Sequence, residues 1–263
     1  MAVFWAMARL RFLTMLAYRL NYWSGVLTYT VYIGGYYYIW RAVYAGRASV
    51  AGMSIDAMVT YLAVAWMTRA FTYNNLDADI EEEVRSGLVA VQLLRPYPYV
   101  VGKLWSAGGE AIFRLIFWML PGMVVAAFLF PVHLPTHPAT YAVWTASAAC
   151  AFLVNAQLNT AFGLFAFSLQ NARGIRWAKT RLVDLLSGVY LPLAFFPTAA
   201  RQVMAWLPFR DIAYVPAAIF TGSIPPAQAA AAVAGQAAWV GGMALLVAFF
   251  WRRLRRVLLV QGG

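Results

Sequence analysis

Six long apolar stretches are the feature that most constrains the fold of this chain. A helix needs about 20 mostly apolar residues to cross the roughly 30 Å hydrocarbon core of a bilayer. Stretches of this kind occupy residues 24–44, 56–71, 111–130, 139–167, 182–197 and 227–251. Over all 263 residues, 63% are hydrophobic and 11% are charged, whereas soluble domains average about 25% charged residues. The sequence therefore predicts an all-α polytopic membrane protein with six transmembrane helices, and excludes a soluble enzyme.

The basic residues predict the orientation of these spans. Fifteen of the 20 Lys and Arg fall in segments that six spans would place on one side of the membrane. Cytoplasmic loops of membrane proteins carry such an excess, so both chain ends are expected in the cytoplasm. The net charge of +11 is then a signal of topology, and no nucleic-acid partner is expected.

Two segments are apolar but are not typical of simple transmembrane helices. Residues 1–23 mix Phe4, Trp5 and Phe12 with Arg9 and Arg11, a composition typical of a helix lying in the membrane interface. Residues 198–222 are broken by prolines and charges, which predicts re-entrant helices buried within the protein. No linker or repeat divides the chain, so residues 1–263 are expected to form one transmembrane domain.

One predicted cytoplasmic segment, residues 76–95, is strongly amphipathic. Apolar residues recur every four positions from Leu76 through Ile80, Val84 and Leu88, and acidic residues lie between them. This period predicts a helix of about four turns, with carboxylates near its positive end. A solvated surface helix is one interpretation. The other is that a cytoplasmic partner grips and moves this element.

Short motifs in the chain resemble those of a known transporter family, in the same order along the sequence. They are Tyr18-Arg19, Glu83-Val84-Arg85-Ser86-Gly87, Leu93-Leu94-Arg95-Pro96, the segment from Tyr190 to Pro197, Leu207-Pro208-Phe209 and Tyr214-Val215-Pro216. Together they resemble bacterial ABC exporter permeases of the six-helix, type-two membrane-domain family. Arg210-Asp211 departs from the pattern, where smaller or apolar residues would be expected.

The resemblance implies a permease that pairs with a second chain, identical or sister, in the bacterial inner membrane. Two ABC ATPase subunits would bind ATP and Mg²⁺, so that no cofactor is bound by this chain, and an amphipathic or hydrophobic substrate would move outward. Residues 76–95 would form the coupling helix that contacts the ATPase. Its contact residues would be Ile80, Glu81, Glu82, Glu83, Val84, Arg85, Gly87, Arg95 and Pro96.

Polar residues inside the predicted spans are candidates for a substrate path or gate, because ionisable groups in hydrocarbon are costly. Glu110 and Arg114 are four residues apart, and could form either an ion pair or a gate. Asn155 and Asn159 share one helix face, and either bond neighbouring helices or line the path. Asp184 is within helical reach of Arg181. The further candidates, in the motif at the end of the fifth span, are Tyr190 and Phe195.

Two other functions remain open from the sequence alone. A lipid-modifying membrane enzyme would need a cluster of acidic, His or metal-binding residues at one membrane face. His133 and His137 are interrupted by prolines, which forbid a regular helix, so no metal site and no catalytic residue is predicted. A passive channel or scaffold is the remaining alternative.

Overall fold

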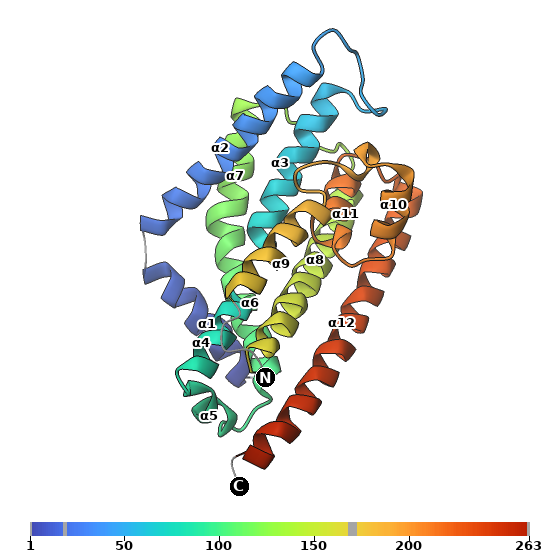
Figure 1. The fold of residues 1–263 in the computed structure, drawn as a ribbon. Helices are drawn as coiled ribbons and strands as arrows, with labels where there is room; N and C mark the ends of the chain where they lie inside the picture. Colours follow the sequence, from blue (N-terminus) through green and yellow to red (C-terminus); the bar gives the residue numbers. More distant parts are fainter. Residues whose placement is uncertain (1, 18–19, 168–172, 262–263) are drawn as a thin grey trace.

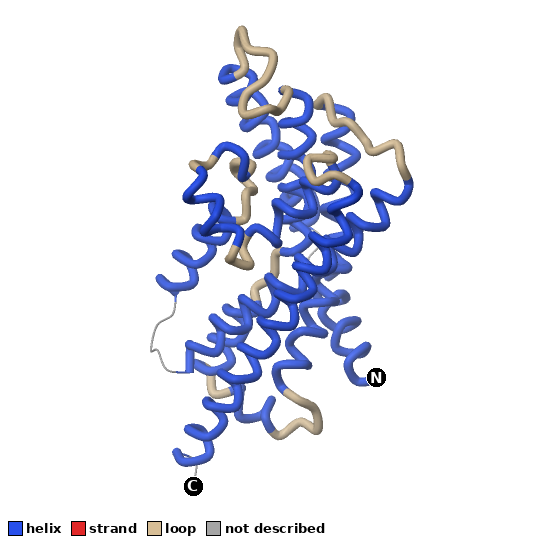
Figure 2. Tube along the Cα trace, turned by 90° about the vertical axis from the view of Figure 1, so that its right-hand side faces the viewer, coloured by secondary structure: helices blue, strands red, loops and turns tan. Residues whose placement is uncertain are grey.

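The computed structural model describes residues 2–17, 20–167 and 173–261, and these residues contain no β-strand. Tyr18 and Arg19 of the predicted motif lie outside the described residues. The helices form one elongated bundle (Figures 1 and 2). They are α1 (Ala2–Ala17), α2 (Leu20–Val43), α3 (Ile55–Thr72), α4 (Leu76–Arg85), α5 (Leu88–Leu93), α6 (Tyr99–Arg114), η1 (Leu115–Met119), α7 (Leu120–Leu129), α8 (Pro138–Leu164), η2 (Phe165–Phe167), α9 (Arg173–Leu186), η3 (Leu193–Phe195), α10 (Thr198–Ala205), α11 (Arg210–Phe220) and α12 (Pro226–Gln261).

Helix α3 is the centre of the bundle. Every residue from 58 to 70 is buried, because α2, α6, α7, α8 and α11 all pack against this helix. Its side chains join those of α2 and α11 in the largest apolar core, around Tyr61, Trp66 and Met67. Surrounded by protein, α3 can carry polar groups such as Arg69 that would be costly facing lipid.

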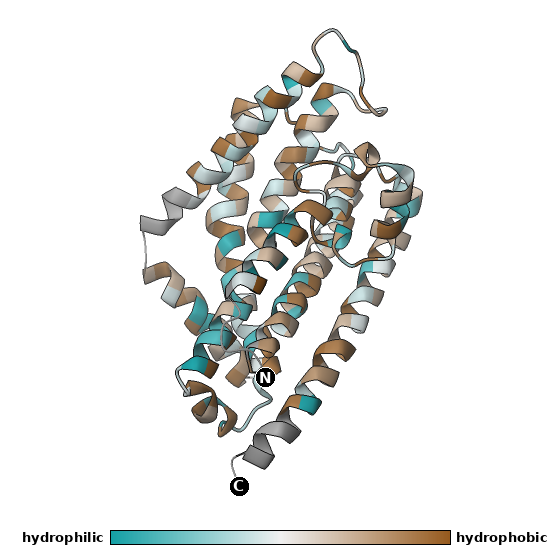
Figure 3. Ribbon diagram, viewed as in Figure 1, coloured by the Kyte–Doolittle hydropathy of each residue, from teal (hydrophilic) through white to brown (hydrophobic). Residues whose placement is uncertain are grey.

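Three described helices are long and apolar enough to cross a membrane: Tyr99–Leu129, Pro138–Leu164 and Pro226–Leu254. The first joins α6, η1 and α7 and starts twelve residues before the predicted span. Its π-helical turn ends at Met119, two residues before Pro121, which has no N–H to donate. Apolar residues cover the outer helices α7 and α12, brown in Figure 3, and the exposed Phe128, Leu245 and Phe249 lie on them.

The other three predicted spans are not confirmed by length and composition. Helices α2 and α3 form where spans were predicted, but neither is apolar enough to meet the same criteria. The prediction that residues 182–197 form one span is wrong, because α9 runs from Arg173 to Leu186 and the chain then turns. Gly188, with φ +82°, adopts a left-handed conformation that ends the helix.

Helices α10 and α11 occupy the predicted re-entrant segment. Together they are apolar enough for a span but are bent by 107° at the break between them, as expected for a broken or re-entrant element. They lie in the upper half of Figure 1, whereas α4, α5 and both chain ends lie in the lower half. The α4–α5 end and the α10 end of the bundle are therefore opposite.

Candidate coupling site and ion-pair network

The predicted coupling helix is two helices, α4 and α5, and the prediction of one continuous helix is wrong. The break falls at Ser86 and Gly87, where Gly87 has φ +75°. A glycine in this conformation just beyond a helix end satisfies the last carbonyl groups and stops the helix. Leu76 and Ile80 of α4 are buried, whereas Leu88 of α5 is exposed. Only the first half of this row of apolar residues therefore packs into the core.

Helix α4 packs directly against α8 at Gly163. A Cβ at that position would lie 2.9 Å from Ile80 Cδ1 and 3.0 Å from Asp77 Cα, so only glycine permits this approach. Nearby, the Asn159 side chain donates to the carbonyl of Asn74 at 3.0 Å and to its side-chain oxygen at 2.9 Å. Asn155 donates to the Thr72 carbonyl at 2.8 Å. These amides hold the segment that connects α3 to α4.

Ion pairs join α4 to α9. Lys179 Nζ lies 2.6 Å from Asp77 Oδ2 and 2.5 Å from Asn159 Oδ1, and all three side chains are buried. Burial lowers the pKa of Lys179, and the carboxylate of Asp77 offsets this only in part. About one turn away on each helix, Arg176 pairs with Glu81. Two parallel ion pairs therefore fix α4 against α9.

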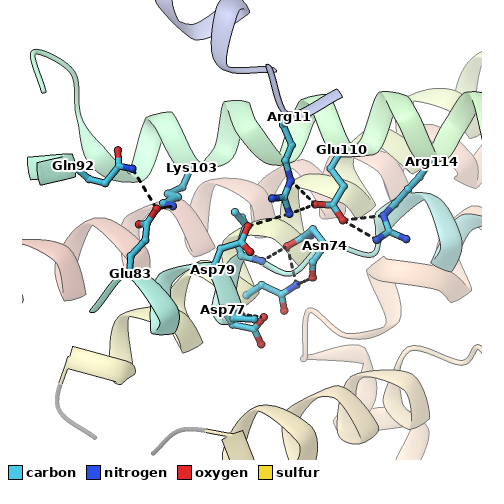
Figure 4. Close-up of polar contacts among 12 residues, drawn as sticks. Arg11, Asn74, Asp77, Asp79, Glu83, Gln92, Lys103, Glu110 and Arg114 are labelled. Atoms are coloured by element: carbon cyan, nitrogen blue, oxygen red, sulfur yellow. Dashed lines mark hydrogen bonds and ion pairs between the residues drawn. The ribbon is translucent and has the colours of Figure 1, made fainter. Parts of the chain in front are cut away.

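A second network joins α4 to α1 and α6 (Figure 4). Arg11 of α1 lies 3.1 Å from Asp79 and 2.8 Å from Glu110, and Arg114 lies 2.7 Å from Glu110. The predicted Glu110–Arg114 ion pair is thus present, with Arg11 as an additional partner that the sequence did not indicate. Burial raises the pKa of Asp79, and the charge of Arg11 lowers it only in part.

Glu83 joins α4 to α5 and α6. Its carboxylate lies 2.5 Å from Lys103 Nζ, accepts a hydrogen bond from the Tyr99 hydroxyl at 2.7 Å, and accepts one from Gln92 at 3.4 Å. With Asp77, Asp79 and Glu81 also paired, four carboxylates of α4 bind cations on other helices of the chain. They anchor α4 to α1, α6 and α9.

The exposed surface of this region belongs to the end of α4 and to α5. Glu82 pairs within α4 to Arg85 at 2.5 Å, with both side chains about 60% exposed. Leu88, Val91 and Leu94 are exposed, Leu94 at 86%. The loop residues that follow, Arg95 and Pro96, are exposed as well, and Val84 is half-buried. We call Leu88, Val91 and Leu94 the α5 apolar surface.

Asp184 is held mainly by a residue that the sequence did not indicate. Arg69 Nε of α3 lies 2.8 Å from Asp184 Oδ1, whereas the predicted partner Arg181 lies 3.9 Å away. The pairing crosses 115 positions of sequence, and sequence periodicity relates residues only within one element. The sequence shows Arg69 as a basic residue within the predicted second span, which indicates a role for it but not its partner.

The candidate path residues lie in separate regions of the bundle. Asn155 and Asn159 line a polar cavity of about 280 Å³ between α4, α8 and α9. Arg114 and Tyr190 line a second cavity of about 330 Å³ between α2, α3, η1 and α9. Phe195 packs against Trp40, with ring centroids 5.0 Å apart, and lines neither. Among the described residues, no three His, Cys, Asp or Glu side chains gather closely enough to hold a metal ion.

The comparison with protein families decides what kind of membrane protein this is. The sequence pattern of the ABC-2 family transporter proteins matches residues 30–259, which is nearly the whole chain. The chain belongs to the ABC-2 transporter family. An ABC-2 protein is a multi-pass membrane subunit of a transporter, and its family implies an ABC ATPase partner. No curated protein and no solved structure matches the chain.

Proposed function

We propose that this chain is the permease subunit of an exporter driven by a separate ABC ATPase, and that the ATPase docks on α5 and the end of α4. The α5 apolar surface carries this proposal. Leu94 is 86% exposed at the end of the bundle that also holds both chain ends (Figure 1). Exposed apolar residues rimmed by charges such as Glu82, Arg85 and Arg95 are typical of protein interaction sites.

The contacts of α4 explain how a force on α5 would reach the rest of the protein. Gln92 of α5 bonds Glu83, which is paired with Lys103 of α6. Asp77 is paired with Lys179 of α9, one of the two ion pairs that fix these helices together. Because buried pairs and close packing transmit displacement rather than absorb it, ATPase closure would move α6 and α9 together with α4.

The remaining parts of the proposal extend the family assignment. The α5 end faces the cytoplasm of the bacterial inner membrane, where the ATPase holds ATP and Mg²⁺. A second permease chain, identical or sister, completes the transporter. The substrate is amphipathic or hydrophobic and leaves outward, and the α4–α9 contact couples ATP hydrolysis to this movement.

The test is recovery of the ATPase with purified variants of the permease. Leu94→Asp places a charge in the middle of the proposed docking surface, and should abolish co-purification of the ATPase while leaving membrane insertion intact. Trp206→Asp is the matched control, because Trp206 is equally exposed at 83% but lies beside α10 at the opposite end. Normal ATPase recovery with Leu94→Asp would contradict the proposal.

A further inference from the structure

The second cavity, which we call the aromatic cavity, is lined by more positive than negative side chains. Its walls are mainly aromatic and include Tyr29, Tyr32, Trp66, Trp118 and Tyr190. The Tyr32 and Trp66 rings stack with centroids 4.8 Å apart. The charged residues that line it are three arginines and one aspartate, namely Arg69, Arg114, Arg181 and Asp184.

Two of these arginines have only one carboxylate between them. Arg114 has a carboxylate partner of its own. It makes two hydrogen bonds to Glu110, at 3.0 and 2.7 Å, and its guanidinium stacks 4.2 Å above the Trp118 ring. Arg69 and Arg181 instead share the single carboxylate of Asp184. Arg69 is 6% exposed, and no described residue accepts a hydrogen bond from its Nη1.

The surplus extends to two indole groups in the same walls. The Nε1–H groups of Trp66 and Trp118 are buried and have no acceptor among the described residues. An unsatisfied buried donor is destabilising, more so when it is charged, and folded proteins hold few of them. These three nitrogens have almost no accessible surface and do not face the cavity. The charge of the lining residues, three arginines and one aspartate, therefore indicates the ligand, and it favours an anion. Aromatic walls alone would suit a cation, but the arginines would repel it.

We infer that the aromatic cavity binds an organic anion, with its acidic group on Arg69 and Arg181 and its apolar body against the aromatic walls. This deepens the proposed function, on which it rests, by naming the class of substrate. Arg69, Tyr73 and Arg181 also line the polar cavity beside α4, so the acidic group would meet Arg69 from either cavity. Asp184 competes for the same guanidinium and would be displaced by the ligand.

Binding of a matched pair of probes tests this inference. Naphthalene-2-sulfonate and 2-naphthylmethylammonium share one ring system and differ in charge. We expect saturable calorimetric binding of the sulfonate to the full chain in phosphatidylcholine nanodiscs, at least about 10-fold tighter than the ammonium. Empty nanodiscs give the blank. Absence of saturable sulfonate binding, or equal binding of the two probes, would overturn the inference.

Variants localise the binding to the two arginines. Arg69→Gln with Asp184→Asn removes both buried charges at once and should weaken sulfonate binding at least about 10-fold. Arg181→Gln changes a side chain that is 57% exposed, so folding is preserved, and it should weaken binding several-fold. Unchanged affinity in either variant would refute the site. Leu94→Asp should keep full sulfonate affinity, which separates failure of this inference from failure of the proposed ATPase docking.

Discussion

Replacing Lys179 by Met tests whether α4 is anchored to α9 by a buried charge pair. The two side chains are each 6% exposed, and Nζ lies 2.6 Å from the Asp77 carboxylate. Met keeps the length of the side chain but leaves Asp77 as a buried carboxylate without its cation. Removing one partner of a buried ion pair costs about 3–5 kcal/mol, and we expect a loss of unfolding free energy in that range.

A double-mutant cycle separates the pair from its surroundings. Asp77→Asn with Lys179→Met removes both charges, so the double variant should recover much of the loss of Lys179→Met. Unfolding in mixed detergent micelles, followed by circular dichroism, supplies the free energies. The control is Arg85→Ala, whose partner Glu82 is exposed and whose loss should cost no more than about 1 kcal/mol. Equal effects of Lys179→Met and the control would refute the anchoring argument.

Two further substitutions test the packing of the bundle. Gly109→Ala places a Cβ 1.9 Å from the carbonyl oxygen of Ala8, and should lower the melting temperature by separating α1 from α6, at a cost of about 1–3 kcal/mol. Gly108→Ala, whose Cβ meets nothing within 4 Å, should leave it unchanged, and a similar drop in both variants would contradict the contact. Gln236→Leu removes a hydrogen bond of 2.8 Å to the Asp211 carbonyl and two hydrogen bonds with Ser147, and should cost about 1–3 kcal/mol of unfolding free energy. Wild-type stability would show that these buried bonds are dispensable.

Features that depend on one element were predictable from the sequence. The long apolar stretches predicted α8, most of α12 and the C-terminal part of Tyr99–Leu129, and all three helices are long and apolar enough to span a membrane. The spacing of Glu110 and Arg114 allowed an ion pair as one of two interpretations, and the pair is present at 2.7 Å. In each case the residues that determine the feature lie within a few turns of one helix, where period and spacing carry the information.

Features that depend on two distant elements were not predictable in the same way. Asp77 and Lys179 are 102 positions apart. The sequence alone is compatible with a solvated or partner-binding acidic face on α4, because it does not show the intramolecular partners of these residues. The break at Gly87 was signalled by the Ser-Gly pair, because glycine is favoured just past a helix end. The apolar period continued beyond this break and made two helices look like one.

The proposed path residues illustrate the same limit. The place of Tyr190 in a motif predicts that it lines the substrate path. Its ring lies 5.5 Å from that of Trp66 in the aromatic cavity. Arg69, which completes that cavity, stands out in the sequence as a basic residue within the predicted second span, but this position does not indicate its partner. Only the tertiary fold brings Arg69 of α3 to Asp184 of α9.

Photo-crosslinking in native membranes tests the central proposal, that a separate ATPase acts on α5. A photoreactive amino acid in place of Leu94 should give a covalent adduct with the ATP-binding subunit on illumination. The same amino acid in place of Trp206, equally exposed beside α10, should give none. An adduct from position 206 alone, or no adduct from position 94 in an assembled and ATP-hydrolysing complex, would contradict the proposal that force enters through this end of the bundle.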